Sequence, residues 1–237
     1  MQHKILWLIT ARSGSKGIKN KNIIRLANKP LLAHRIISAK KVKVDSKIWI
    51  STDSKKYAAI AQQYGAEAPF FRPKKLSNDK ASSIEVALHA IEWGEKNNIF
   101  FNYLGILEPT SPFVLADHLK DALKILDKNP AATGIVATKK ITPNTFLTQK
   151  NSKYLTVLAK RLKLLQDTRR QAFVEEITPS GGFYIAKVSS LKRQKAFYTK
   201  KTLSYKLTEP FNLEIDNKMD LLWAKFVTAK KMKKSIL

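Results

Sequence analysis

The sequence predicts a single α/β domain, residues 1–237, built on a mostly parallel β-sheet flanked by helices. Its 237 residues are 44% hydrophobic, which is enough for one substantial core. Short apolar runs of strand length alternate with segments in which apolar residues recur at helical spacing. Successive strands lie about 25 to 35 residues apart, a spacing typical of the helical crossovers that join parallel strands.

The first part of the chain shows this alternation clearly. Residues 4–10, KILWLIT, form a continuous apolar run typical of a strand buried on both faces of a sheet. Residues 31–41 have apolar positions at helical spacing, and residues 47–51, KIWIS, predict a second strand. Residues 54–66 predict a helix that Gly65 ends in a left-handed conformation.

The middle of the chain continues the pattern. Residues 82–97 predict a strong helix, with Ser82 or Ser83 as the N-cap and Glu85 placed to complete a capping box. Residues 103–109, YLGILEP, predict a buried strand that ends at a proline.

The pattern then changes after one more helix and strand, expected at 117–129 and 133–139. Residues 140–180 contain short alternating runs and polar turns, which favour an insertion with hairpin strands. The parallel pattern is expected to return with the strand 181–188, GGFYIAKV. Residues 214–234 predict a loop followed by a long amphipathic terminal helix.

The net charge is extreme, because 44 lysines and arginines oppose 18 acidic residues to give +26. Such a charge attracts polyanions, including nucleic acid. The cations are spread along the whole chain, and the densest cluster, AKKMKK at 229–234, ends a predicted helix whose dipole it complements. We therefore interpret the excess as a solvated surface and expect no specific nucleic-acid partner.

The sequence also indicates a compartment. Cysteine is absent, which excludes disulfides and fits a reducing environment. No apolar stretch approaches the roughly 18 residues of a transmembrane helix, and the first apolar run is soon followed by Arg12. We expect a cytoplasmic protein with no membrane partner.

The loop that follows the first strand, LITARSGSKGIKNKN at 8–22, combines flexibility with positive charge. Two glycines, Gly14 and Gly17, free the backbone to wrap around an anion. The loop cations are Arg12, Lys16, Lys19 and Lys21. Neither a Walker A loop nor a dinucleotide fingerprint is present.

Three other polar segments are expected at the same edge of the sheet. They are STDS at 51–54, EPTSP at 108–112 and EIDN at 214–217. In an open α/β sheet, ligands bind outside the carboxyl ends of the strands. The four segments together therefore predict one anion-binding site at this edge.

The ordered motifs of the chain resemble those of the acylneuraminate cytidylyltransferases, enzymes that make CMP-activated sialic acids and related nonulosonic acids. The first loop, residues 11–22, looks like the family signature A-R-x-G-S-K-G-I-x-x-K-N. Further similar segments follow in order over nearly the whole chain: STDS at 51–54, YGAEAPFFRPKKLSNDKASSIEV at 64–86, LEPTSPF at 107–113, SGGFYI at 180–185 and EIDNKMDL at 214–221.

The resemblance implies a Rossmann-like three-layer nucleotidyltransferase fold with an inserted, hairpin-containing dimerisation arm at about 140–180. It implies a homodimer that transfers CMP from CTP to the anomeric oxygen of a nonulosonic acid and releases pyrophosphate.

The resemblance also implies a nucleotide site. Arg12 and Lys21 would hold the triphosphate and act in catalysis, and Asn22 would contact the nucleotide. The other residues implied to bind the nucleotide are Ser13, Arg72, Ser82 and Ser83.

A triphosphate favours a hard cation with oxygen ligands, and we expect Mg²⁺. Glu214 and Asp216 alternate around Ile215, so in an extended segment both carboxylates lie on one face. The resemblance implies metal-binding carboxylates at both positions, where the family usually has Asp. Asp216 matches this pattern, whereas Glu214 keeps the charge but has a longer side chain.

The chain differs from the sialic-acid enzymes of this family at two positions that are expected to affect sugar binding. Glu108 stands where sialic-acid enzymes commonly have Gln, and it would serve the metal or accept a hydrogen bond from a sugar hydroxyl or amide. Thr178 precedes the strand where those enzymes carry arginine, so Arg169 or Arg170 would grip the sugar carboxylate instead. Thr110 and Ser111 complete the expected sugar site. Sialic, legionaminic and pseudaminic acids all remain open as the acceptor.

Three alternatives stay open at this point. The first is a CMP-Kdo synthetase, which shares the fold and the nucleotide. The second is a basic nucleic-acid-binding protein, suggested by the net charge of +26. The third is an inactive paralogue that binds nucleotide without turnover.

Overall fold

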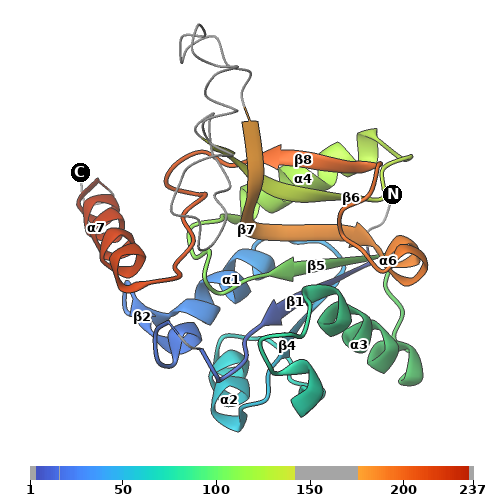
Figure 1. Ribbon diagram of the computed structural model, residues 1–237, viewed down its shortest axis with the longest axis horizontal. Coiled ribbons are helices and arrows are strands. Elements are labelled where there is room, and N and C mark those ends of the chain that lie inside the picture. The colour runs from blue at the N-terminus through green and yellow to red at the C-terminus, as the bar shows by residue number, and fades with distance from the viewer. Residues whose placement is uncertain (1–3, 16, 142–175, 235–237) are drawn as a thin grey trace, which may run out of the picture.

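The computed structural model of the chain describes residues 4–15, 17–141 and 176–234. Within these residues, a mixed six-stranded sheet forms the centre of the molecule, in the order β4-β1-β5-β7-β6-β8 (Figure 1). Its strands, in this order, are Ser46–Ser51, Ile5–Thr10, Tyr103–Leu107, Glu176–Lys187, Gly134–Ile141 and Thr202–Lys206. The pairs β4–β1 and β1–β5 are parallel, as the spacing predicts, and β6–β8 is parallel as well.

Helices cover both faces of the sheet, which confirms the three-layer α/β architecture. The described α-helices are α1 (Leu31–Lys40), α2 (Lys55–Gln63), α3 (Ser83–Lys96), α4 (Ala116–Lys128), α6 (Val188–Gln194) and α7 (Lys218–Lys234). Helices α1, α2 and α4 pack on one face with Ile5, Trp7 and Ile9 of β1. Helices α3 and α6 pack on the other with Leu6 and Leu8, because successive strand side chains point to opposite faces.

The predicted helix boundaries follow from capping. Ser82 accepts a hydrogen bond from the Glu85 amide, and the Glu85 carboxylate accepts one from the Ser82 amide, so the capping box at α3 is confirmed. Gly65 has a φ of +95°, the left-handed conformation expected after α2. Ser54 caps the start of α2 by accepting from the Tyr57 amide.

One expected strand direction is wrong. The expected strand 181–188 corresponds to the end of β7, which begins earlier, at Glu176, ends at Lys187 and runs antiparallel to both β5 and β6. The ends of the expected insertion at 140–180 are thus sheet strands, since β6 extends to Ile141. The rest of that insertion, with its expected hairpin arm, lies outside the described residues.

Several short elements were not expected from the sequence. They are β8, α6, the small antiparallel pair β2 (Arg25–Leu26) and β3 (Lys29–Pro30), and the 3₁₀ turns η1 (Lys21–Ile23) and η2 (Lys74–Leu76). Each is too short to show a clear apolar period.

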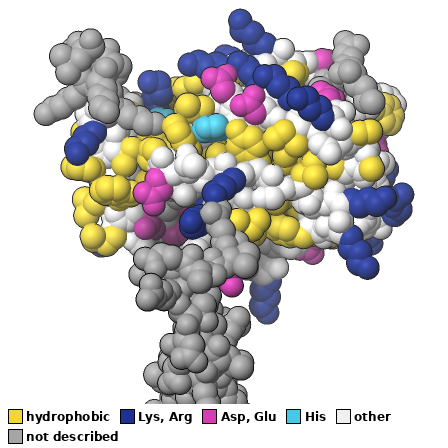
Figure 2. Space-filling view, turned by 90° about the horizontal axis from the view of Figure 1, so that it is seen from above, with side chains coloured by type: hydrophobic (Ala, Val, Ile, Leu, Met, Phe, Trp, Pro, Cys, Tyr) yellow, Lys and Arg dark blue, Asp and Glu magenta, His cyan; other side chains and the backbone are white. Residues whose placement is uncertain are grey.

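Charged side chains are spread over the visible surface (Figure 2). On the face shown in Figure 2, lysine and arginine side chains occur in several separate groups among apolar and acidic ones. Among the described residues, no helix is both long and apolar enough to cross a membrane.

Candidate active site

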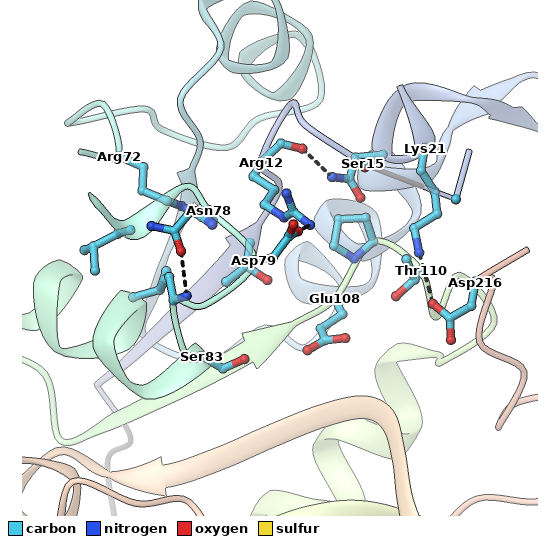
Figure 3. A pocket seen from close by; sticks show the side chains of 17 residues that line it. Arg12, Ser15, Lys21, Arg72, Asn78, Asp79, Ser83, Glu108, Thr110 and Asp216 are labelled. Carbon is cyan, nitrogen blue, oxygen red and sulfur yellow. Dashed lines mark hydrogen bonds and ion pairs between the residues drawn. The ribbon is translucent and has the colours of Figure 1, made fainter. Parts of the chain in front are cut away.

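A cavity of about 430 Å³ opens at the carboxyl ends of β1 and β5 (Figure 3). Its walls come from the loop after β1, the segment between η2 and α3, the end of β5 and the residues before α7. The polar lining residues are Thr10, Arg12, Ser15, Lys21, Asn22, Arg72, Asn78, Asp79, Ser83, Glu108, Thr110 and Asp216. The structure thus brings together most of the site residues named from the sequence.

Arg12 enters the cavity from the first loop and is held by two acceptors. Its Nη1 donates to the Gly14 carbonyl at 2.6 Å and its Nη2 to Asp79 Oδ1 at 2.5 Å. The guanidinium is therefore oriented before any ligand arrives. Asp79 and its neighbour Asn78 were missed by the sequence reasoning, although both lie in the family-like segment 64–86.

Lys21 closes the other side of the cavity. Its Nζ lies 3.0 Å from Asp216 Oδ1, and only 17% of its side chain is exposed. The loop approaches this segment closely, because a Cβ on Gly17 would lie 2.8 Å from the Asp216 carbonyl. Glycine at this position therefore allows the cationic loop and the carboxylate segment to meet.

Two residues named for nucleotide binding stabilise the first loop itself. Both the amide and the hydroxyl of Ser13 donate to Asp53, at 2.8 and 2.9 Å. The Asn22 side chain donates to the Arg12 carbonyl at 3.0 Å and also lines the cavity. Ser13 does not line the cavity, and its hydroxyl is directed to Asp53. STDS at 51–54 thus supports the loop through Asp53.

Arg72 is buried beside the cavity. Its guanidinium donates to the Ser51 hydroxyl at 2.9 Å and to the Ser51 carbonyl at 2.5 Å. Burial lowers the pKa of Arg72 to about 10, opposed by the nearby carboxylate of Asp53. The side chain remains a cation at neutral pH and connects the end of β4 to the cavity wall.

The two serines at the start of α3 differ in placement. The Ser82 side chain caps the helix, whereas Ser83 lines the cavity at the helix N-terminus. Because the amides of a helix N-terminus favour negative charge, this end of α3 suits an anionic ligand.

The carboxylates of Glu108, Glu214 and Asp216 lie near one another in this part of the structure. Burial and, to a smaller extent, the negative charges of Glu214 and Asp216 raise the pKa of Glu108 to about 7, although Lys21 and Arg35 act in the opposite direction. Burial and Asp216 also raise the pKa of Glu214. The three carboxylates therefore influence one another electrostatically.

The Glu214 carboxylate packs against Gly181. Gly181 has a φ of +64°, and a Cβ there would lie 2.5 Å from Glu214 Oε1. Any larger residue would displace the carboxylate, and the left-handed backbone disfavours one in any case. Glu214 does not line the cavity, whereas Asp216 does.

The residue types fit a hard divalent cation, because oxygen ligands and excess negative charge meet beside an expected triphosphate site. The described residues contain no group of three acidic or histidine side chains close enough to hold an ion by themselves. A cation here would need further ligands, which phosphate oxygens and water can supply.

The expected sugar residues are only partly described. Thr110 lines the cavity, and its carbonyl accepts from the Ile215 amide at 2.8 Å, which ties the end of β5 to the segment before α7. The Ser111 hydroxyl is buried, with no hydrogen-bond partner among the described residues. Arg169 and Arg170 lie outside the described residues.

Comparison with known proteins relates this geometry to a family. A family model described as cytidylyltransferase matches residues 6–225. The chain is 33% identical to an N-acylneuraminate cytidylyltransferase of Escherichia coli, covering 100% of this chain and 55% of that protein. It is 32% identical to a CMP-N,N'-diacetyllegionaminic acid synthase of Legionella pneumophila, covering 93% and 94%. It is 30% identical to a pseudaminic acid cytidylyltransferase of Campylobacter jejuni, covering 94% and 96%.

These relatives differ in length. The chain spans about half of the Escherichia coli protein but nearly all of the other two.

Solved structures show the same fold. A CMP:2-keto-3-deoxy-manno-octonic acid synthetase complexed with CTP matches with a TM-score of 0.68 at 16% identity, covering 96% of this chain and 99% of that one. A 4-diphosphocytidyl-2C-methyl-D-erythritol synthase from Anaerococcus prevotii matches with a TM-score of 0.63 at 13% identity, covering 96% and 99%.

Proposed function

Because this chain belongs to the cytidylyltransferase family, we propose that it transfers CMP from CTP to the anomeric oxygen of a nonulosonic acid and releases pyrophosphate. One observation supports the proposal above the others. Arg12 and Lys21, from a loop at the carboxyl end of β1, line a single cavity together with the carboxylates Glu108 and Asp216. This arrangement provides cations for a triphosphate and acceptors for a sugar within one site.

In the proposed reaction, the anomeric hydroxyl oxygen forms a bond to the α-phosphorus of CTP and loses its proton to solvent. The bond between that phosphorus and the oxygen bridging to the β-phosphate breaks, and this oxygen leaves with pyrophosphate. Arg12 and Lys21 neutralise the charge that develops on the departing pyrophosphate. The N-terminus of α3, at Ser83, adds oriented amides near the nucleotide. Catalysis in such a reaction comes mainly from positioning and electrostatics, which these fixed side chains supply.

The proposal includes Mg²⁺, held by Asp216 with Glu214 or Glu108 nearby. When bound, such an ion would offset phosphate charge in the way that is general for nucleotidyl and phosphoryl transfer. We also propose a cytoplasmic location, which the cysteine-free composition fits.

The acceptor is tested by pyrophosphate release. Purified protein with CTP and Mg²⁺ is expected to release pyrophosphate with one acid from a panel of N-acetylneuraminic, legionaminic, pseudaminic and Kdo acids. The three relatives above, with three different acids in their names, make the first three the expected candidates. Release with Kdo alone would indicate that the chain is a CMP-Kdo synthetase. CTP binding without any release would favour the inactive paralogue.

We further propose that the chain is a homodimer, and the surface of α7 supports this. Four large apolar side chains, Met219, Leu222, Trp223 and Phe226, are 70%, 57%, 50% and 47% exposed. Their spacing puts them on one side of the helix, opposite the buried Ala224. An exposed apolar stripe of this kind is typical of a surface that another subunit covers.

Charged substitutions on this stripe are expected to shift the protein towards the monomer. Trp223→Glu should do so because it would bury a charge in the interface, and light scattering after size exclusion measures the mass. Phe100→Glu is the control, because Phe100 is 57% exposed but lies outside α7. A dimer that survives Trp223→Glu, or a wild-type monomer, would count against this interface.

A further inference from the structure

We propose that Asp79 is a positioning residue for the triphosphate: its carboxylate holds the Arg12 guanidinium so that the remaining N–H groups of Arg12 are available to phosphate oxygens. The inference rests on the proposed binding of CTP. It concerns a residue that the sequence reasoning did not identify.

The contact between Asp79 and Arg12 joins two loops that lie far apart in the chain. Arg12 Nη2 donates to Asp79 Oδ1 at 2.5 Å, and both side chains line the cavity (Figure 3). Arg12 Nη1 donates to the Gly14 carbonyl at 2.6 Å. Because a guanidinium is planar, acceptors on both terminal nitrogens fix its plane, and it carries more N–H donors than these two acceptors use. Donors with a fixed direction therefore remain for a ligand.

Asp79 belongs to a segment that is itself fixed at both ends. Arg72 joins the start of this segment to Ser51 at the end of β4. Within it, Asn78 Oδ1 accepts hydrogen bonds at 2.8 and 3.1 Å from the two backbone amides that follow Asp79. Ser82 ends the segment as the N-cap of α3. The Asp79 carboxylate can therefore support Arg12 without first being ordered by the ligand.

The main chain of Arg12 is fixed as well. Its carbonyl accepts from the Asn22 side chain at 3.0 Å, and the amide of the next residue, Ser13, donates to Asp53 at 2.8 Å. These contacts leave open the direction of the long Arg12 side chain, whose rotamer freedom is costly to lose on binding. Asp79, together with the Gly14 carbonyl, fixes that direction at the far end of the side chain.

The charge of Asp79 needs an explanation at this place. A carboxylate beside a triphosphate site repels phosphate, so on charge alone it would lower the affinity for CTP. Stability does not explain it either, because the Arg12 and Asp79 side chains are 30% and 41% exposed, and an ion pair so exposed adds little to the free energy of unfolding. Orientation of the guanidinium is the remaining effect, and charge-assisted hydrogen bonds of arginine are well suited to it.

A double-mutant cycle on CTP binding tests this role. Asp79→Ala is made in the native and the Arg12→Ala backgrounds, and the Kd for CTP is measured by calorimetry. We expect Asp79→Ala to raise Kd by about tenfold in the native background but by less than about twofold in Arg12→Ala, because only an existing guanidinium can lose its orientation. Equal losses in both backgrounds would show that Asp79 only shapes its own loop, and would overturn the proposal. Tighter CTP binding by Asp79→Ala would also overturn it, because the carboxylate would then compete with the phosphates.

Glu95→Ala is the matched control. Glu95 pairs with Lys192 at 2.8 Å at comparable exposure but does not line the cavity. Its removal should leave the Kd for CTP within about twofold of the native value. The same loss in Glu95→Ala as in Asp79→Ala would mean that removing any such ion pair weakens CTP binding, and the specific role of Asp79 would fail.

Thermal unfolding separates orientation from folding. The Tm of Asp79→Ala should lie within about 3 °C of the native value, because its ion pair is exposed. A clearly lower Tm with an unchanged Kd for CTP would make Asp79 merely structural and would contradict the proposal.

Binding and turnover together distinguish this inference from the proposed function. If the cycle has the expected form but no acid is turned over, the proposed transfer fails and the role of Asp79 stands. If pyrophosphate is released with an acid but Asp79→Ala binds CTP like the native protein, the role of Asp79 fails and the transfer stands. If the native protein does not bind CTP, both fail.

Discussion

Lys21→Ala is expected to lower kcat/KM for pyrophosphate release by about 10²- to 10³-fold, the loss typical of removing one group that stabilises transition-state charge. Lys21 is held in place, since only 17% of its side chain is exposed and its Nζ lies 3.0 Å from Asp216. A fixed cation of this kind acts on developing phosphate charge without reorganising. Initial rates at several CTP concentrations measure the effect.

The control is a neighbouring lysine of the same loop. Lys19 is exposed and does not line the cavity, so Lys19→Ala should change kcat/KM by no more than a few-fold. Equal losses in Lys19→Ala and Lys21→Ala would mean that the loop acts only through its total charge. Full activity in Lys21→Ala would show that this lysine is not needed for the proposed reaction.

Asp216→Ala is expected to reduce activity by about 10²-fold or more and to raise the Mg²⁺ concentration needed for half-maximal rate. Asp216 lines the cavity and offers a carboxylate that is 66% exposed, whereas Glu214 packs on Gly181 and does not line the cavity. Activity measured over a Mg²⁺ titration therefore gives the comparison between the two carboxylates.

Glu214→Gln is the graded comparison, because it removes the charge but keeps the shape. We expect it to shift the Mg²⁺ requirement less than Asp216→Ala. A larger effect of Glu214→Gln would exchange the roles of the two carboxylates. An unchanged Mg²⁺ requirement in both variants would show that neither holds the ion.

The position of the site could be predicted because it follows from topology. The carboxyl ends of parallel strands meet at one edge, so the loop after β1, the end of β5 and the segment before α7 had to converge. The structure places Lys21, Glu108 and Asp216 together there.

The direction of β7 could not be predicted in the same way. Its apolar residues fit a strand in either direction, because alternation along a strand does not depend on the direction of its neighbours. The sequence between Ile141 and Glu176 does not determine in which direction the next strand runs.

Arg35 and Asp53 show why hydrogen bonds between residues far apart in the chain could not be predicted from the sequence. An arginine in a helix is usually solvated, and nothing near Arg35 in the chain indicates that the carbonyls of Val114 and Gly182, 79 and 147 residues away, will surround it. Asp53 binds Ser13 over 40 residues. Both contacts exist only after the loops meet.

The most direct test of the account is to identify where the CMP goes. Phosphorus NMR and mass spectrometry of a reaction with CTP, Mg²⁺ and the active acid should show one CMP–acid ester for each pyrophosphate, with the ester at the anomeric oxygen. Pyrophosphate accompanied only by free CMP, or no pyrophosphate with any nonulosonic acid although CTP binds, would contradict the proposed transfer.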